Sequence, residues 1–583
     1  MDAIKLSILN LYHRLRQFAL RLREHQQVAV GKQKRRAELP DWKAIVGSNE
    51  RLWQESLAKA EAGPRVLIAT AIGGHPQFTV LESVLSVALT LRGAKVDVLL
   101  CDMAMPACQR AKISGIKPPA LGEGRLAEVF CQGCVATGSE VFSVPGMTMQ
   151  HMSENISDAE RLRANDIANS MTADEIPGYQ WNELPIGEHA LAGALRYYGI
   201  GDLTLEPEGQ EVLRRYLESS LLTAFCMRNL LAKNRYDVVV NNHGIYVPHG
   251  IVSAVCRGDR VRTVSWNLAY RKQCAIFSHG DTYHHTLMSE PVDTWESMIW
   301  SEQQDFEILR YLNSRRTGSR DWIWFNRDAD DDMGRFAVEV GLDWNKPVIG
   351  MLTNVVWDAQ LHYPNNAFPG MIDWVMRTIA YFRSRPDLQL LIRVHPGELA
   401  PPGGSTVSRQ PIAEEIHSKF PHMPNNVFII GPESTVSTYA AMDRCDSVII
   451  YGTKTGVELT SVGIPVIVAG EAWIRNKGLT LDATNAESYF RILDTLPLRK
   501  RMDATQIDRA RKYAYHFFFR RMIPMPFLDP KPESWPPFEV ALPALDALLP
   551  GSYKGLDTIC NGILNGSPFI YHAEDFGLHD NLQ

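Results

Sequence analysis

Apolar residues recur along the chain with two alternating periods, and this alternation predicts an α/β protein. A short apolar run at 66–71 precedes apolar residues at helical spacing between Phe78 and Leu91, and a second run follows at 96–100. Apolar runs of this length are typical of strands buried on both faces, and a helix between two such strands joins them in parallel. The pattern therefore predicts a βαβ unit that begins near residue 65.

A second region with the same alternation begins near Lys346. Its first strand is predicted at 347–354, followed by a helix at 370–384. Further strands are predicted at 236–241, 261–265 and 274–277 in the first region, and at 388–394, 427–430, 447–450 and 465–468 in the second. We infer two doubly wound parallel-sheet domains of Rossmann-like type, with a ligand cleft between them.

A length of 583 residues is too great for one ordinary core, which agrees with several domains. We predict a basic amphipathic helix at 1–40 and a first Rossmann-like domain at 64–340, with a helical insertion at about 151–235. The second Rossmann-like domain is predicted at 345–505, and helices at 506–583 should pack back across both domains. The basic helix at 1–40 has two interpretations: it packs on the body or on a second subunit, or it lies on an anionic membrane surface.

Composition and charge narrow the class of protein. The chain has 45% hydrophobic and 22% charged residues, as in soluble globular proteins, and a net charge of -6 gives no reason to expect nucleic acid as a partner. No apolar run is long enough for a transmembrane helix, and the N-terminus lacks the continuous apolar core of a signal peptide. We therefore expect a cytoplasmic protein, located peripherally on the inner face of the membrane if the N-terminal helix binds lipid.

Polar residues follow two of the strands predicted in the second region. His395 follows the strand 388–394, and Thr453–Thr455 follow the strand 447–450, with Glu458 early in the next helix. Open α/β sheets bind ligands at the carboxyl ends of their strands, and helix-start N–H groups suit a phosphate. A histidine beside them can hold the same phosphate or protonate its oxygen. The chemistry indicated is departure of a nucleotide phosphate.

Four segments together are similar to the bacterial capsule and surface-polysaccharide biosynthesis glycosyltransferases of GT-B fold: Thr353–Asp358, Arg393–Glu398, Gly452–Glu458 and Gly463–Ile467. The pair His395–Pro396 also resembles that of bacterial sialyltransferases, Kdo transferases and polyol-phosphate polymerases. The resemblance is clearest over about 345–485. It implies transfer of a sugar from a CMP-, UDP- or GDP-linked donor to a glycan or lipid-linked acceptor, with no cofactor required for catalysis.

The resemblance places the donor site on the second domain. His395 would contact the donor phosphate, as hydrogen-bond donor or as acid. Thr453 and Thr455 stand where the family has hydroxyl residues that hold phosphate oxygens, often serines. Lys454 would neutralise the departing phosphate, and Glu458 resembles the glutamate that binds the nucleotide ribose.

Three further residues are predicted on the donor side: Asn354, Arg393 and Glu398. Arg393 lies on a largely apolar strand, so its guanidinium needs a partner, either a protein carboxylate or the ligand. Glu398 has three readings: it holds His395 in place, it binds sugar hydroxyls, or it is an ordinary loop carboxylate.

The first domain would supply the acceptor side and, for an inverting enzyme, a catalytic base. His75 follows the first strand in the sequence Gly73-Gly74-His75-Pro76, which resembles the glycine-rich first loop of several GT-B enzymes. His243 follows a later strand and is the other candidate. The stereochemistry of transfer stays open. Histidines between 279 and 285 match no metal signature and are read as loop residues.

Four of the nine cysteines form a group with metal-binding potential, namely Cys101, Cys108, Cys131 and Cys134. The spacing C-x6-C followed by C-x2-C would suit a structural zinc ion or an iron–sulfur cluster, and buried free thiols are the alternative. Nine cysteines in a chain of this length argue against a disulfide scaffold.

Three other functions stay open. A polyol-phosphate transferase of the same fold would use a CDP-alcohol donor, and a nucleotide-sugar 2-epimerase would need no acceptor. A non-catalytic subunit of a glycan-assembly complex is the third alternative, and such a subunit has no need of a site for a leaving phosphate.

Overall fold

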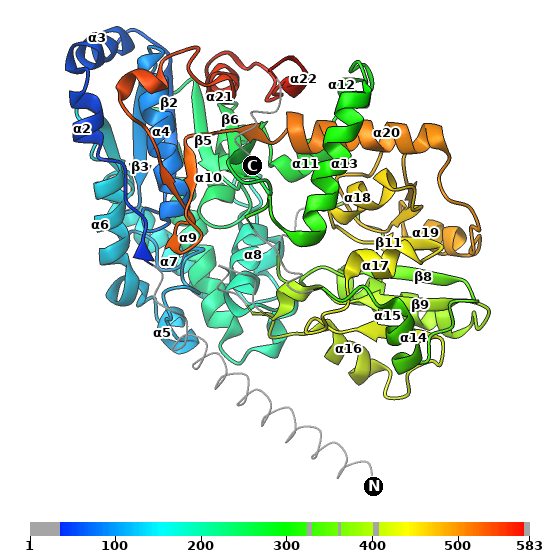
Figure 1. Cartoon of the computed structure of the whole chain (residues 1–583). Helices are drawn as coiled ribbons and strands as arrows, with labels where there is room; N and C mark the ends of the chain where they lie inside the picture. The colour runs from blue at the N-terminus through cyan, green and yellow to red at the C-terminus, as the bar shows by residue number, and fades with distance from the viewer. Residues whose placement is uncertain (1–34, 323–328, 359–362, 400–406, 577–583) are drawn as a thin grey trace.

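The computed structural model describes residues 35–322, 329–358, 363–399 and 407–576, and it contains two α/β domains (Figure 1). One domain is built on a sheet of seven strands and the other on a sheet of six. Helices cover both faces of each sheet. The predicted class, two Rossmann-like domains in a GT-B-like arrangement, is therefore confirmed.

The N-terminal sheet has the order β14-β7-β6-β5-β2-β3-β4. Its parallel strands are β2 (Arg65–Ala71), β3 (Lys95–Leu100), β4 (Thr148–His151), β5 (Val238–Asn242) and β6 (Arg262–Leu268). Alternate side chains of β2 enter different cores: Val66 and Ile68 pack with α4 (Pro76–Leu91), and Leu67 and Ala69 pack with the helices of the opposite face. Burial on both faces explains why the strand is apolar at every position.

The expectation of a wholly parallel sheet is wrong at one edge. β7 (Cys274–His279) runs antiparallel to β6, and β14 (Ile523–Pro524) runs antiparallel to β7. Only residues 269–273 join β6 to β7, and a parallel pair needs a far longer crossover.

The predicted helical insertion contains three long helices on one face of the N-terminal sheet: α7 (Asp158–Ser170), α8 (Ile186–Tyr198) and α9 (Gly209–Lys233). The α9 helix packs against α7, α8 and α10 (His249–Gly258). Further helices of this half are α2 (Trp42–Gly47), α3 (Glu50–Ala60), α5 (Pro118–Gly122), α6 (Gln132–Val141), α11 (Tyr283–Ser289), α12 (Asp293–Glu296) and α13 (Glu302–Thr317).

The C-terminal sheet is wholly parallel, in the order β10-β9-β8-β11-β12-β13. Its strands are β8 (Val348–Leu352), β9 (Gln389–Arg393), β10 (Val427–Ile430), β11 (Ser447–Ile450), β12 (Val466–Val468) and β13 (Leu481–Asp482). The chain runs outward from β8 to β10 and then returns to the other side of β8 at β11. The topological switch point, where such sheets bind ligands, therefore lies between β8 and β11. Its helices are α14 (Met333–Val340), α15 (Met371–Arg383), α16 (Ile412–Lys419), α17 (Thr438–Asp443), α18 (Thr455–Ser461) and α19 (Ala486–Leu493).

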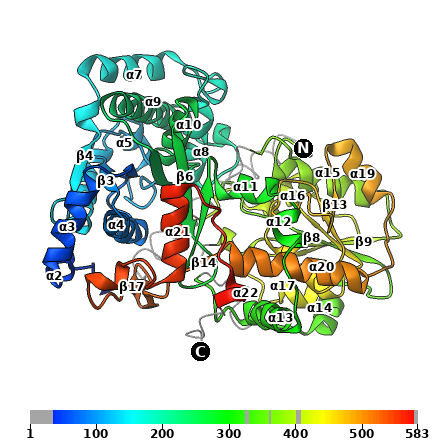
Figure 2. The ribbon, with the colours of Figure 1, turned by 90° about the horizontal axis from the view of Figure 1, so that it is seen from above.

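The C-terminal segment returns across both domains (Figure 2). The α20 helix (Ala504–Tyr515) packs on α18 and α13, whereas α21 (Lys554–Asn565) packs on α4 and β14. This segment was expected to be helical, but it also contributes β14 to the N-terminal sheet, and β15 (Leu528–Pro530) pairs with β17 (Phe538–Val540). The short helix α22 (Ala573–Phe576) follows.

The basic helix predicted at 1–40 lies mostly outside the described residues. Arg35–Arg36 form the short strand β1, which pairs with β16 (Ser534–Trp535), and the next helix begins only at Trp42. The predicted helix therefore does not extend to residue 40. Within the described parts of the chain, none of the helices combines the length and the apolar character needed to cross a membrane.

Candidate active site at the domain junction

His395 lies at the carboxyl end of β9, beside the switch point of the C-terminal sheet. Its backbone N–H donates to Thr353 Oγ1 at 3.1 Å, and its Nδ1 accepts the Gly397 N–H at 2.9 Å. Because Nδ1 accepts, the neutral ring carries its proton on Nε2. Burial, together with the nearby Lys454 and Arg393 cations, lowers the pKa of His395 to about 4. The side chain is therefore neutral at pH 7 and can donate one hydrogen bond from Nε2.

The segment that follows β11 lies next to the segment that follows β8. The Gly452 N–H donates to Asn354 Oδ1 at 3.3 Å. Thr453 Oγ1 accepts the Thr455 N–H at 3.3 Å and lies 3.1 Å from Thr455 Oγ1. The structure thus brings these predicted donor-side residues together, with two hydroxyls at the start of α18. Lys454, in the same segment, lies close enough for its charge to lower the pKa of His395.

Glu458 lies in a buried charge network. Its Oε2 accepts the Tyr439 hydroxyl at 2.6 Å and lies 3.1 Å from Arg315 Nε, while Lys454 Nζ lies 3.7 Å from Oε1. Burial alone would raise the pKa of Glu458, but Arg315 and Lys454 outweigh it and lower the pKa. The carboxylate is therefore ionised, and its Oε1 has no hydrogen-bond partner among the described residues.

Two residues predicted on the donor side are engaged by neighbouring loops. The Arg393 guanidinium donates to the carbonyls of Gly431 and Ser434 and to the Thr438 hydroxyl. Its hydrogen-bond partners among the described residues are thus loop groups, and the Glu433 carboxylate lies near enough for its charge to act on the arginine.

Glu398 accepts the Ile412 N–H at 3.2 Å, at the start of α16, and burial raises its pKa to about 8. Arg393 thus holds the loop after β10, and Glu398 holds the start of α16.

His243 follows β5 and faces the C-terminal domain. Its backbone is left-handed, with φ of 62°, and its ring centroid lies 5.2 Å from that of Tyr246 and 5.9 Å from that of His284. Burial and the Arg196 cation lower its pKa to about 4, although Asp358 opposes this shift. Its Nδ1 is buried without a hydrogen-bond partner among the described residues. His243 is thus neutral at pH 7 and able to accept a proton.

His75 precedes α4 and stacks on Phe78, with ring centroids 4.1 Å apart. Burial lowers its pKa well below the usual range, and the charges of Arg110, His249 and Arg196 lower it further. Its Nδ1 also lacks a hydrogen-bond partner in the described part of the chain. The groups that influence His75 all belong to the N-terminal domain, whereas Asp358 of the C-terminal domain acts on His243.

The sequence interpretation gave no role to Asp358, although it ends one of the segments that carry the family resemblance. Asp358 Oδ1 lies 2.9 Å from Arg196 Nη1 and accepts the Tyr246 hydroxyl at 2.7 Å. Asp358 belongs to the C-terminal domain, and both partners belong to the N-terminal domain. Its charge acts on the pKa of both His243 and His395. Asp358 therefore lies between the base candidate and the donor side.

Aromatic residues from both domains surround this junction. The Tyr363 hydroxyl lies 3.3 Å from His284 Nδ1, and the Trp473 ring centroid lies 5.3 Å from that of His284. Lys454 Nζ lies 4.8 Å from the centre of the Tyr270 ring, which is cation–π distance. His284, which the sequence suggested was a loop residue, is therefore part of the junction. Its neighbour His285 instead pairs with Asp281 at 2.9 Å.

Buried neutral histidines make the stability of the protein dependent on pH, and His249 is the clearest case. Its Nε2 donates to the Thr70 carbonyl at 2.8 Å, and burial lowers its pKa from 6.5 to about 4. The unfolded chain therefore binds a proton at a pH where the folded chain does not. The stabilisation is complete above pH 6.5 and is lost as pH falls toward 4, by about 3 kcal/mol for this residue.

We expect the His249→Gln variant, which keeps an N–H donor, to lose less stability than the wild type between pH 7 and about 4.5. Urea unfolding at both pH values measures the difference. An equal loss in the two proteins would contradict the assignment of this pH dependence to His249.

No protein-family model and no curated protein matches the chain. Among solved structures, a β-Kdo 2,4-transferase, KpsC of Thermosulfurimonas dismutans, is 12% identical with a TM-score of 0.30, covering 48% of this chain and 79% of that one. The calicheamicin glycosyltransferase CalG4 is 11% identical with a TM-score of 0.22, covering 78% and 94%. A UDP-GlcNAc 2-epimerase from Neisseria meningitidis, bound to UDP-GlcNAc, is 9% identical with a TM-score of 0.21, covering 78% and 95%. At such low similarity these structures carry no argument about activity.

Proposed function

We propose that the protein is a nucleotide-sugar-dependent glycosyltransferase that acts on a glycan or lipid-linked acceptor in the assembly of surface polysaccharide. The observation that carries the proposal is the position of Asp358. This residue connects the donor side, at His395 and Lys454, with His243 on the facing domain. Groups suited to a leaving phosphate and a group suited to a proton thus meet at one junction.

The donor side would bind the phosphates of the nucleotide sugar. Lys454 supplies a cation, Thr453 and Thr455 supply hydroxyls, and His395 supplies its Nε2 proton. Because His395 is neutral at pH 7, it would stabilise the departing phosphate as a hydrogen-bond donor, which favours the first of the two roles that the resemblance implied.

The acceptor side would contain the base. The acceptor hydroxyl would give its proton to His243 as its oxygen forms a bond to the anomeric carbon, and the bond from that carbon to the phosphate oxygen would break, with the electron pair leaving on the phosphate. Asp358 favours the protonated form of His243, so it would stabilise the imidazolium that results. This route inverts the configuration of the anomeric carbon.

A thermal-shift screen with CMP, CDP, UDP, GDP and their sugar conjugates tests the donor site. A ligand of the native state at a hundred times its Kd stabilises the protein by about 2.7 kcal/mol. We expect a shift with one base only, weakened in His395→Ala and unchanged in His417→Ala, which alters an exposed histidine of the same domain. Absence of a shift with every nucleotide would overturn the proposal.

The reaction is tested with the donor found in this way. Transfer of the labelled sugar to an added glycan or lipid-linked acceptor is the expected result. Formation of the C2 epimer of the nucleotide sugar without any acceptor would indicate a 2-epimerase instead, and a requirement for a CDP-alcohol would indicate a polyol-phosphate transferase.

A further inference from the structure

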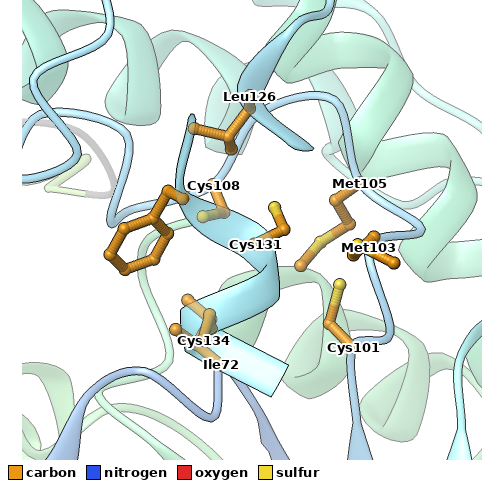
Figure 3. A pocket seen from close by; sticks show the side chains of 9 residues that line it. Ile72, Cys101, Met103, Met105, Cys108, Leu126, Cys131 and Cys134 are labelled. Carbon is orange, nitrogen blue, oxygen red and sulfur yellow. The ribbon is translucent and has the colours of Figure 1, made fainter. Parts of the chain in front are cut away.

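The four predicted metal-binding cysteines line one pocket of the N-terminal domain (Figure 3). Cys101 follows β3, and Cys108 lies in the loop after it. Cys131 ends the short π-helix η1 (Ala127–Cys131), and Cys134 lies in the first turn of α6. All four are free thiols. Two separate segments of the chain, with the spacing that suggested a metal site, thus contribute two cysteines each to a single cavity.

The pocket offers sulfur and almost nothing else to a ligand. Its other walls are the side chains of Ile72, Leu126 and Phe130, with the thioethers of Met103 and Met105, around a cavity of about 20 Å³ that is partly open to solvent. None of the side chains that line it carries an oxygen or nitrogen atom. Thiolates in an apolar shell select soft metals, zinc and iron–sulfur clusters among them.

Backbone N–H groups approach three of the four sulfurs. Cys101 faces the N–H groups of Ala104 and Met105, and Cys108 faces that of Arg110. Such N–H groups stabilise thiolates and tune the metal centres that the thiolates bind.

Cys134 Sγ accepts the Gly74 N–H at 2.9 Å. A Cβ atom at Gly74 would lie 2.9 Å from the same sulfur, and one at Gly73 would lie 2.7 Å from the Cys134 carbonyl oxygen. The two glycines of the first loop therefore permit a close approach to Cys134.

A buried cation beside the pocket has no carboxylate partner among the residues that the structure describes. The Arg110 side chain is 5% exposed, and its Nε and Nη1 have no hydrogen-bond partner within the described residues. Cys108 and Cys134 both lie close enough to influence it. A buried, uncompensated guanidinium is costly unless an anion faces it. Four thiolates around a metal centre would supply that negative charge.

The separation of the sulfurs indicates the kind of centre. Among the described residues, no three histidine, cysteine or carboxylate side chains are placed to hold a single metal ion. A structural zinc ion needs four ligand atoms close around it, with sulfurs at about 2.3 Å from the metal. In a four-iron cluster each thiolate binds a different iron, so the sulfurs stand farther apart. The four thiols share one pocket without being grouped as for a single ion, which favours the cluster.

We propose that Cys101, Cys108, Cys131 and Cys134 bind a [4Fe–4S] cluster. All four cysteines are used as ligands, so every iron atom has its protein ligand and none is left open to a substrate. It fixes the segment 101–134 against the loop that carries Gly74 and His75, at the acceptor side of the domain junction. The inference stands on the N-terminal domain alone and does not depend on the proposed transferase activity.

The test is chemical analysis of the full chain purified without oxygen, and again after reconstitution with ferrous iron and sulfide. We expect about four iron atoms and four acid-labile sulfides per chain, with the visible absorption of an iron–sulfur cluster. Folded protein that takes up neither iron nor sulfide after reconstitution would overturn the proposal, and so would stoichiometric zinc bound at these thiols in place of iron.

Variants locate the cluster. Cys101→Ser and Cys134→Ser should lose most of the iron and of the visible absorption, and Cys256→Ser is the matched control. Cys256 is fully buried in the same domain but does not line the pocket, so its variant should keep the cluster. If a ligand variant does not fold, the metal content of the wild type still decides the matter. Retention of the full iron content by folded Cys101→Ser and Cys134→Ser proteins would contradict the assigned ligands.

Discussion

The His395→Ala variant is expected to transfer sugar roughly 10²–10³ times more slowly than the wild type, because it lacks the hydrogen-bond donor nearest the leaving phosphate. The loss should appear mainly in kcat, since charge on the leaving oxygen develops in the transition state and is small in the bound donor. The fold should persist, because the backbone contact of His395 with Thr353 does not involve the ring. Steady-state kinetics with the donor identified by thermal shift provide the measurement.

Two control variants make this result specific. His417→Ala removes an exposed histidine from α16 of the same domain and should leave kcat unchanged. His395→Gln keeps an N–H donor at a similar distance, so it should recover part of the lost rate. Turnover of His395→Ala at the wild-type rate, in a protein that binds donor normally, would exclude His395 from leaving-group stabilisation.

Five of the six strands of the C-terminal sheet could be predicted, because their burial makes short apolar runs in the sequence, whereas the two-residue edge strand β13 was not predicted. β10 and β11 coincide with two predicted apolar runs, since both faces of each strand are covered by helices. Two edge strands leave no such trace. The exposed residues of β4 include Thr148 and Met149, and β14 pairs Ile523 with Ala275, 248 positions apart in the sequence. The stability of these pairs comes from tertiary contacts, which no local pattern encodes.

The same distinction applies to the site. His395 and Thr453–Thr455 were predicted together because each follows a strand, and parallel strands end at the same edge of the sheet. Arg196 could not be found in this way, because it comes from an inserted helix and meets Asp358 only when the two domains pack. For Arg393 the sequence indicated the need for partners but not which groups supply them. An arginine on an apolar strand does need partners, but carbonyl groups of a neighbouring loop provide them.

Asp358 also explains how the two domains can share one reaction. Its carboxylate is held by Arg196 and Tyr246 of the N-terminal domain, and burial, which would raise its pKa, is outweighed by these partners, so that the pKa is lowered. An ionised carboxylate at this position favours a proton on His243. It also connects the loop after β8 with the N-terminal domain, as the ion pair between Arg409 and Glu206 connects the two domains elsewhere.

Replacing His243 is expected to lower kcat by roughly 10²–10⁴-fold while leaving donor affinity unchanged, because His243 accepts the acceptor proton and does not bind the donor. Asparagine is the best substitute, since it tolerates the left-handed backbone at this position and cannot act as a base. Kinetics and donor thermal shifts of His243→Asn, measured together, separate the two variants. The His395→Ala variant should lower kcat and also weaken the thermal shift with donor, whereas His243→Asn should lower kcat alone.

The pH profile gives an independent check on the base. Since the pKa values of His243 and His395 are both lowered to about 4, the kcat/KM of the wild type should stay constant through pH 6.5 and fall only as pH approaches 4. His75→Gln tests the other candidate in the same domain, and it should retain most of the turnover. Both rings are buried and neutral, so either could accept a proton. A large loss of kcat in His75→Gln with little change in His243→Asn would therefore assign the role of base to His75.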